Sequence, residues 1–160
     1  MNKKDIMKKT VIFDLDGTLA LIDSRREISI GDDGKMDWDT FFNPKMISLD
    51  DPNTDVINMA RILKSQGFHI WILSGRSDRT KDATIDWLNQ HDVPFDKLMM
   101  RPLDKKSHFM KDSDLKQGWL DDSDIVDKDD VFAVFDDRNQ VVDMWRDNGL
   151  QVFQVADGDF

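Results

Sequence analysis

Two aspartates two positions apart follow an apolar run close to the start of the chain. Residues 11–13, with the sequence VIF, precede Asp14 and Asp16, and Gly17 and Thr18 come directly behind them. Because side chains alternate along an extended chain, the two carboxylates point to the same side. Like charges at a buried strand end repel each other and lose solvation. A divalent cation removes this cost, and Mg²⁺ prefers carboxylate oxygens. We therefore expect Asp14 and Asp16 to bind Mg²⁺.

The same four residues suit chemistry on a phosphate group. Protein-bound Mg²⁺ keeps several waters and shares its ligand shell with substrate phosphates. Gly17 permits a sharp turn, and Thr18 offers a hydroxyl and a backbone N–H to phosphate oxygens. A carboxylate can attack phosphorus to give an aspartyl-phosphate. A second carboxylate can protonate the leaving alkoxide and later deprotonate water. The pair therefore indicates phosphoryl transfer in two steps.

Polar side chains also follow two later apolar runs. FHIWILSG, residues 68–75, ends in Ser74 and Gly75, and VFAVFDD, residues 131–137, ends in Asp136 and Asp137. In open parallel sheets, ligands bind outside the carboxyl ends of the strands. We therefore expect Ser74, Asp136 and Asp137 to lie beside the first aspartate pair.

Apolar runs and helical periodicities alternate along the chain, which predicts an α/β fold. The predicted strands cover residues 9–15, 68–75, 95–100, 131–137 and 150–155, and the predicted helices 53–66, 77–91, 114–120 and 139–148. Right-handed crossovers then give a mainly parallel sheet between two helical layers, a three-layer Rossmann-like arrangement. Residues 26–49 do not fit the alternation and are expected to form an insert or small lid within a single domain, residues 1–160.

Composition excludes several classes of protein. Hydrophobic residues make up 39% of the 160 residues and charged residues 34%, which is typical of a globular chain. The net charge of −10 disfavours nonspecific binding along a nucleic-acid backbone, although a few local arginines suffice to recognise one terminal phosphate. The densest acidic run, residues 121–130, is expected to be an exposed loop. The absence of cysteine fits a reducing cytoplasm, and no apolar stretch predicts a membrane segment.

The strand-end residues carry a resemblance to a known superfamily. DLDGT at residues 14–18, with Ser74 and the Asp136–Asp137 pair, resembles the haloacid dehalogenase superfamily of phosphatases. The resemblance implies that Asp14 is the nucleophile and Asp16 the general acid and base. It further implies that Ser74 holds the phosphoryl group and that the late acidic pair completes the Mg²⁺ site.

A narrower resemblance covers about two thirds of the chain. DLDGTLALIDSR, LSGRSDRTK, MRPLDKKSHFMKDSDLK and FDDRNQVVDMWRDNGLQVFQVADGDF are similar to the 3′-phosphatase domains of bacteriophage polynucleotide kinase/phosphatases. This similarity implies that the substrate is a 3′-phosphorylated nucleic-acid end or nucleotide, and that a phage-encoded chain acts in the host cytoplasm. The motif GxxxxGK[ST] does not occur, so no kinase activity is expected. The oligomeric state stays open.

The narrower resemblance also implies roles for cationic residues. Lys116 takes the charge-neutralising role, oriented by Asp112, and Lys111 is the alternative lysine. Guanidinium and ammonium groups suit a transition state whose charge spreads over the equatorial phosphate oxygens. The residues implied to surround the substrate phosphate or the leaving group are Arg25, Arg76, Arg101 and Arg138.

Two other functions are compatible with the strand-end pattern. A nucleotidase or small-metabolite phosphatase would use the same residues, and the acidic composition favours it. A receiver-like signalling module would also form an aspartyl-phosphate but would not turn over a substrate. Among the aromatic residues, Trp38 and Phe41 of the insert are the expected nucleoside contacts. The tryptophans expected in the core are Trp71, Trp87, Trp119 and Trp145.

Overall fold

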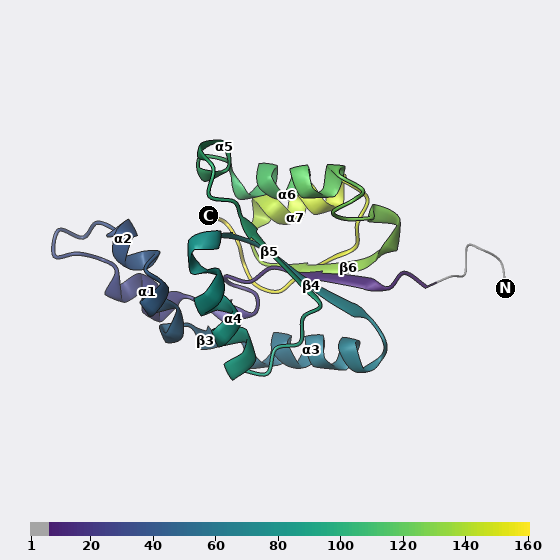
Figure 1. Ribbon diagram of the computed structural model, residues 1–160, viewed down its shortest axis with the longest axis horizontal. Coiled ribbons are helices and arrows are strands. Elements are labelled where there is room, and N and C mark those ends of the chain that lie inside the picture. The colour runs from purple at the N-terminus through teal and green to yellow at the C-terminus, as the bar shows by residue number, and fades with distance from the viewer. Residues whose placement is uncertain (1–6) are drawn as a thin grey trace.

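A five-stranded parallel sheet lies at the centre of the computed structural model, which describes residues 7–160 (Figure 1). The strand order is β5-β4-β1-β6-β7, and every neighbouring pair is parallel. The strands are β1 (Thr10–Phe13), β4 (His69–Ser77), β5 (Lys97–Arg101), β6 (Val131–Asp136) and β7 (Val152–Gln154). The central position of β1 follows from its apolar sequence, because all four of its residues are buried.

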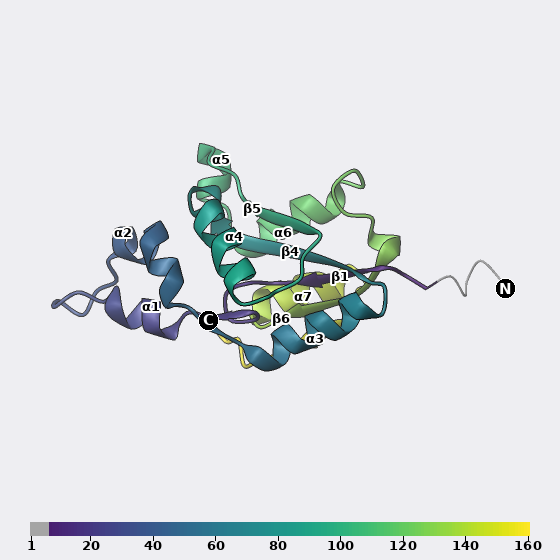
Figure 2. The same ribbon diagram turned by 60° about the horizontal axis from the view of Figure 1, so that its bottom comes forward.

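Helices cover both faces of this sheet, so the predicted three-layer α/β fold is confirmed (Figures 1 and 2). On one face α3 (Thr54–Ser65) and α4 (Lys81–Gln90) pack on the sheet through Ile57, Ala60, Trp87 and Leu88. On the other face lie α6 (Asp112–Asp121) and α7 (Asn139–Asp147). Their core residues are Leu115, Trp119, Leu120, Val141, Val142, Met144 and Trp145.

The element boundaries differ from the predicted ones by a few residues. Helix α6 begins two residues before the predicted start, and β4 continues two residues beyond the predicted end at Gly75. A short helix, α5 (Lys105–His108), was not predicted, and Asp104 caps it by accepting a hydrogen bond from Ser107 N (2.8 Å). Two short 3₁₀ helices, η3 (Asp78–Thr80) and η4 (Lys128–Asp130), precede α4 and β6.

The predicted insert is a small cap beside the carboxyl ends of the strands (Figure 2). It consists of α1 (Asp23–Ile28), α2 (Trp38–Phe41) and the 3₁₀ helix η2 (Pro44–Leu49). The antiparallel strands β2 (Ala20–Leu21) and β3 (Asp51–Pro52) join it to the sheet domain. The cap thus begins a few residues before residue 26, and its first helix carries a predicted site residue.

The aromatic residues lie mostly as predicted. Trp87, Trp119 and Trp145 are buried, and Trp71 is partly buried against the cluster that contains Trp119 and Trp145. Trp38 is 58% exposed. Phe41 differs from the prediction, because it is buried and its ring lies 4.5 Å from the guanidinium carbon of an arginine, so it has no free face for a nucleoside. In the described part of the chain, no helix has the length and apolar character needed to cross a membrane.

Candidate active site

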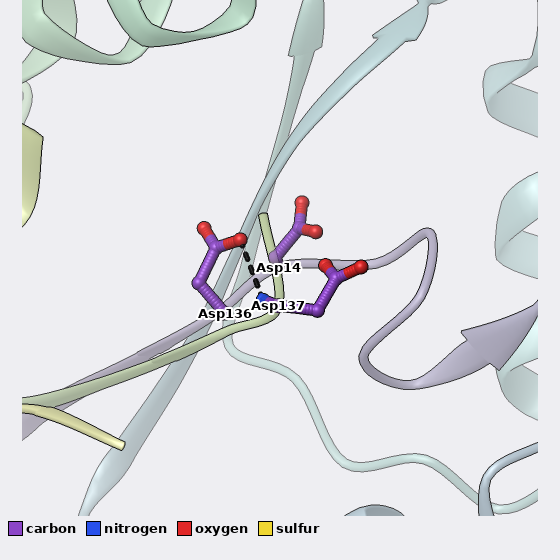
Figure 3. A group of neighbouring side chains, drawn as sticks. All are labelled: Asp14, Asp136 and Asp137. Atoms are coloured by element: carbon purple, nitrogen blue, oxygen red, sulfur yellow. Dashed lines mark hydrogen bonds between the residues drawn. The ribbon is translucent and has the colours of Figure 1, made fainter. Parts of the chain in front are cut away.

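Three carboxylates meet where the central strands β1 and β6 end (Figure 3). Asp14 follows β1, Asp136 is the last residue of β6, and Asp137 comes next. Each offers one oxygen, and the three oxygens lie within 4.8 Å of one another. All three residues are buried. Parallel strands ending at the same edge therefore place side chains that are 123 positions apart in sequence in one cluster, as predicted.

Lys116 of α6 supplies positive charge to this cluster. Its Nζ donates to Asp14 Oδ1 at 2.8 Å and lies 3.4 Å from Asp136 Oδ2. Trp145 Nε1 donates to the same Asp136 oxygen at 3.1 Å. Burial lowers the pKa of Lys116, but Asp136 and Asp14 outweigh it and hold that pKa above its ordinary value. Lys111, the alternative lysine, is exposed at the start of α6, so the structure places Lys116 in the site.

The cluster has more negative charge than one lysine offsets. Burial and the neighbouring Asp136 raise the pKa of Asp14 well above its ordinary value, although Lys116 lowers it. Burial and Asp136 also raise the pKa of Asp137. Carboxylates held together at this energetic cost are typical of a site that binds a cation.

The turn after β1 fits closely around Asp137. Gly17 has a φ of +82°, and a Cβ at this position would collide with the Asp137 carboxylate. Thr18 is fully buried, and its Oγ1 donates to Asp137 Oδ1 at 3.3 Å. The side chain of Thr18 therefore orients a carboxylate in this structure, whereas the sequence pattern had assigned it to the substrate phosphate.

Asp16 lies outside the carboxylate cluster, in contrast to its predicted role as a metal ligand. Its Oδ1 accepts from Arg76 Nη2 at 2.6 Å and from Arg25 Nη2 at 3.3 Å. Although burial raises the pKa of Asp16, Arg76 and Arg25 outweigh burial and lower it below the ordinary value. Both arginines are buried, so in this structure they hold a carboxylate of the protein instead of facing an open phosphate site.

Asp50 completes this ion-pair network, and no sequence motif predicts this role. Its carboxylate accepts from Arg25 Nε at 2.9 Å and from Arg76 Nη2 at 2.6 Å, and it is buried. Burial raises the pKa of Asp50 to about 6, even though both arginines lower it. Asp50 lies at the end of the cap, within an acidic SLDD stretch that has no motif spacing. Only the tertiary contacts distinguish it from its exposed neighbour Asp51.

Ser74 lies in an irregular segment of β4. Pairing between β4 and β5 shifts register between Leu73 and Ser77. Ser74 is buried, and its Oγ accepts from the backbone N–H of Arg76 at 3.1 Å. At Gly75, a Cβ would collide with the Asp112 carboxylate. The irregularity thus brings the backbone of β4 against the start of α6.

Asp112 joins two of the predicted substrate arginines. It pairs with Arg101 Nη2 and, at 3.3 Å, with Arg138 Nη1. Arg101 also donates to the carbonyls of Gly75, Ser107 and Met110 at 2.6–2.8 Å, so protein acceptors occupy its guanidinium. Arg138 is about one third exposed and donates from Nε to the Phe160 carbonyl. Asp112 therefore positions these two arginines, whereas the resemblance had assigned it to Lys116.

Comparison with known proteins places the chain in a family. Residues 8–160 match the polynucleotide kinase PNKP phosphatase domain. A protein of Autographa californica nuclear polyhedrosis virus, whose name describes a bifunctional polynucleotide kinase/RNA ligase, is 34% identical over 157 residues. The match covers 95% of this chain and 20% of the viral protein.

Two solved structures show the same architecture. A chain of the Pnkp1/Rnl/Hen1 RNA repair complex matches with a TM-score of 0.79 and 31% identity, over 100% of this chain and 46% of that one. The haloacid dehalogenase-like protein SP0104 from Streptococcus pneumoniae matches with a TM-score of 0.64 and 14% identity, over 91% of this chain and 83% of that one. The chain thus spans about half of the repair protein and a fifth of the viral protein.

The family match extends over nearly the whole chain, and the fold and the cluster of strand-end carboxylates agree with it. The chain belongs to the family of PNKP phosphatase domains, within the haloacid dehalogenase phosphatases, and it is a phosphoric monoester hydrolase.

Proposed function

We propose that this chain is a Mg²⁺-dependent 3′-phosphatase that acts on nucleic-acid ends through an aspartyl-phosphate. One observation carries the proposal: Asp14 lies at a strand end beside a buried lysine and two further carboxylates. A nucleophilic carboxylate, a cation site and a buried ammonium in one cluster are what two-step phosphoryl transfer requires. The match to PNKP phosphatase domains supports the choice of a 3′-phosphorylated strand as the substrate.

The residues present fit a magnesium ion. Asp14, Asp136 and Asp137 offer hard oxygen donors within reach of one cation. The raised pKa values of Asp14 and Asp137 show how costly these charges are together. These three residues would hold the ion. When bound, Mg²⁺ offsets negative charge on the carboxylates and on the phosphoryl oxygens. The side chain of Asp16, held by two arginines, is left for proton transfer.

In the first step, a carboxylate oxygen of Asp14 attacks phosphorus and forms an acyl-phosphate bond. The bond between phosphorus and the 3′-oxygen breaks, and that oxygen takes a proton from Asp16. Lys116 stays beside Asp14 and offsets negative charge as it builds on the phosphoryl oxygens. The hydroxyl of Ser74 is the proposed donor to one of these oxygens, because its hydrogen-bond partner on Arg76 uses only the oxygen lone pair.

In the second step, Asp16 takes a proton from water while that water attacks phosphorus. The acyl-phosphate bond breaks, inorganic phosphate leaves, and Asp14 is regenerated. Arg25 and Arg76 lower the pKa of Asp16 against the effect of burial, which favours the ionised form that this step needs. The first step needs the protonated form, and the negative charge of an arriving substrate phosphate raises the pKa of Asp16 toward it.

Substitution of the nucleophile tests the mechanism. Asp14→Asn removes the attacking carboxylate, so phosphate release from a 3′-phosphorylated oligonucleotide with Mg²⁺ should fall at least 10³-fold. Asp55→Asn, a change of the same kind in the first turn of α3, is the matched control and should keep wild-type activity. Retention of wild-type turnover by Asp14→Asn would exclude this residue as the nucleophile.

A panel of substrates tests the proposed specificity. Phosphate release should be fastest from the 3′-phosphorylated oligonucleotide, slower from a 3′-mononucleotide, and slowest from a 5′-mononucleotide and a sugar phosphate. A preference for the mononucleotides would support the alternative, a nucleotidase of the same fold, to which the net charge of −10 is also suited.

A further inference from the structure

A basic and apolar surface loop adjoins the candidate active site. The β5–α6 loop, which we define as residues 102–110, begins where β5 ends at the carboxyl edge of the sheet (Figure 1). Lys105 and Lys106 are exposed, and Leu103 and Phe109 are 71% and 83% exposed. Phe109 is the most exposed of the large hydrophobic residues in the described part of the chain. Nothing in the catalytic proposal uses these side chains.

The loop is ordered by the residues that also shape the site. Arg101 donates to the carbonyls of Ser107 and Met110 at 2.6 and 2.7 Å, and its Nε donates to the Gly75 carbonyl at 2.8 Å. Asp104 accepts from both the backbone N–H and the hydroxyl of Ser107. The guanidinium of Arg101 therefore fixes the loop against the part of β4 that follows Ser74. The exposed side chains of the loop thus lie on the rim of the site.

A hollow is present on this rim. A cavity of about 310 Å³ is lined by Ser77 and Arg101 together with loop residues, among them Leu103, Lys105 and Phe109. The ring of His108 lies edge-on to that of Phe109, with 4.7 Å between the centroids. The hollow thus combines two cationic side chains with an exposed aromatic ring.

The charge of the loop is opposite to that of the whole chain. The chain has a net charge of −10, yet residues 102–110 carry two lysines and one aspartate, and Arg101 precedes them. The acidic run at residues 121–130 precedes β6 and lies at the opposite, amino end of the strands. The net charge of the chain repels a nucleic-acid strand, and the lysines of the loop offer the strand a local attraction at this rim.

We propose that the β5–α6 loop binds the single strand that leads to the terminal 3′-phosphate. Phe109 stacks on a base, and Lys105 and Lys106 pair with backbone phosphates. Exposed aromatic rings beside cationic side chains are how proteins hold single strands without reading their sequence. The inference rests on the proposed function, and it adds that recognition extends beyond the terminal nucleotide along the strand.

Two variants test the loop. Phe109→Ala and the double variant Lys105→Glu/Lys106→Glu should each raise KM for a 3′-phosphorylated 12-mer at least 5-fold, with kcat unchanged. Neither should alter hydrolysis of a 3′-mononucleotide, because that substrate is too short to reach the loop. The control Lys8→Glu/Lys9→Glu makes the same change of net charge at exposed positions beside the start of β1, and it should leave KM for the 12-mer within 2-fold of wild type.

The outcomes distinguish a failure of the inference about the loop from a failure of the proposed function. An unchanged KM for the 12-mer in both loop variants, or equal losses in the loop variants and the control, would overturn the inference. Equal losses on the 12-mer and the mononucleotide would also overturn it, because the loop would then act on the site itself.

If wild type releases no phosphate from either substrate, the proposed function is refuted. A direct binding measurement can still test the loop in that case. Fluorescence anisotropy with a labelled 12-mer and the Asp14→Asn protein then shows whether the loop binds the strand. Binding that weakens at least 5-fold in the lysine variant supports the loop, and binding that stays the same, or is absent from the start, refutes it.

Discussion

Asp50 is buried, and its ionised carboxylate lowers the stability of the folded protein. Its carboxylate bridges Arg25 and Arg76, and the same two guanidiniums hold Asp16. A pKa of about 6 means that burial outweighs the attraction of both arginines. Asp50 is therefore better explained as a positioning residue, which fixes two arginines around the general acid and base, than as a stabilising ion pair.

The raised pKa of Asp50 predicts how stability changes with pH. In the unfolded chain this carboxyl titrates near 3.8, and in the folded protein near 6, so the folded state binds more protons between these values. Its contribution to the free energy of unfolding is thus fully present below pH 4 and is lost as the pH rises to about 6. The loss amounts to about 3 kcal/mol.

Urea unfolding of wild type and Asp50→Asn between pH 4 and 7 measures this contribution. The asparagine does not titrate, so the stability of wild type relative to the variant should decline as the pH rises through the window. Asp51→Asn, at the exposed neighbour, should give a curve parallel to wild type. Parallel curves for Asp50→Asn as well would show that Asp50 does not titrate as stated.

The position of Lys116 gives a second prediction at the scale of single residues. Lys116→Met removes the ammonium between Asp14 and Asp136, so kcat for a 3′-mononucleotide should fall at least 10²-fold. Lys111→Met, at the exposed alternative lysine on the same helix, should change kcat less than 2-fold. The reverse ranking in a phosphate-release assay would assign the charge-neutralising role to Lys111.

At the scale of elements, sequence reasoning found the parts that carry periodic signals. The five strands and four long helices have apolar runs or helical spacings, and the strand-end carboxylates follow directly from them. The ion-pair network did not follow, because Arg25 and Asp50 lie in a cap whose short helices have no periodicity. Helix α5 was missed for the same reason, although Asp104 three residues before Ser107 is a recognisable capping signal.

The roles of the arginines were the least predictable part of the site. Arg25, Arg76 and Arg101 were expected to face a phosphate, yet protein oxygens accept their hydrogen bonds. A guanidinium has five donors in a fixed fork, and the sequence does not say which acceptors fill them. Such partners become visible only when the cap, β4 and α6 are placed together.

The turn between β1 and β2 gives a prediction at the same scale. Gly17→Ala meets the Asp137 carboxylate and also forces an alanine to a φ of +82°, so activity should fall at least 10-fold and stability by about 1–2 kcal/mol. Gly67→Ala imposes a similar φ of +94° after α3, where nothing lies within 4 Å of the added Cβ. This control should lose comparable stability in urea unfolding but keep full activity. Equal activity in the two variants would show that the fit around Asp137 is unimportant.

At the scale of the whole molecule, the chain is acidic, with a net charge of −10, and the β5–α6 loop is a local basic segment. The acidic run at residues 121–130 lies at the amino ends of the strands, and the lysines of the β5–α6 loop lie at the carboxyl ends. We expect a nucleic-acid strand to approach this acidic protein through that loop. The surface that it offers is small, so the number of phosphates it contacts should also be small.

The salt dependence of binding follows from this small number of contacts. About three phosphate contacts on a single strand give a slope near −2 for the logarithm of affinity against the logarithm of salt concentration, well below the slope of a protein that tracks a long groove. Anisotropy titrations of a labelled 3′-phosphorylated 12-mer with the Asp14→Asn protein measure this slope. Lys105→Glu/Lys106→Glu removes two of these contacts and should bring the slope to about −0.7, whereas Asp124→Asn/Asp129→Asn, within the acidic run, should leave it unchanged. A wild-type slope steeper than about −5 would show that the strand contacts a second basic surface, and it would contradict the small number of phosphate contacts proposed here.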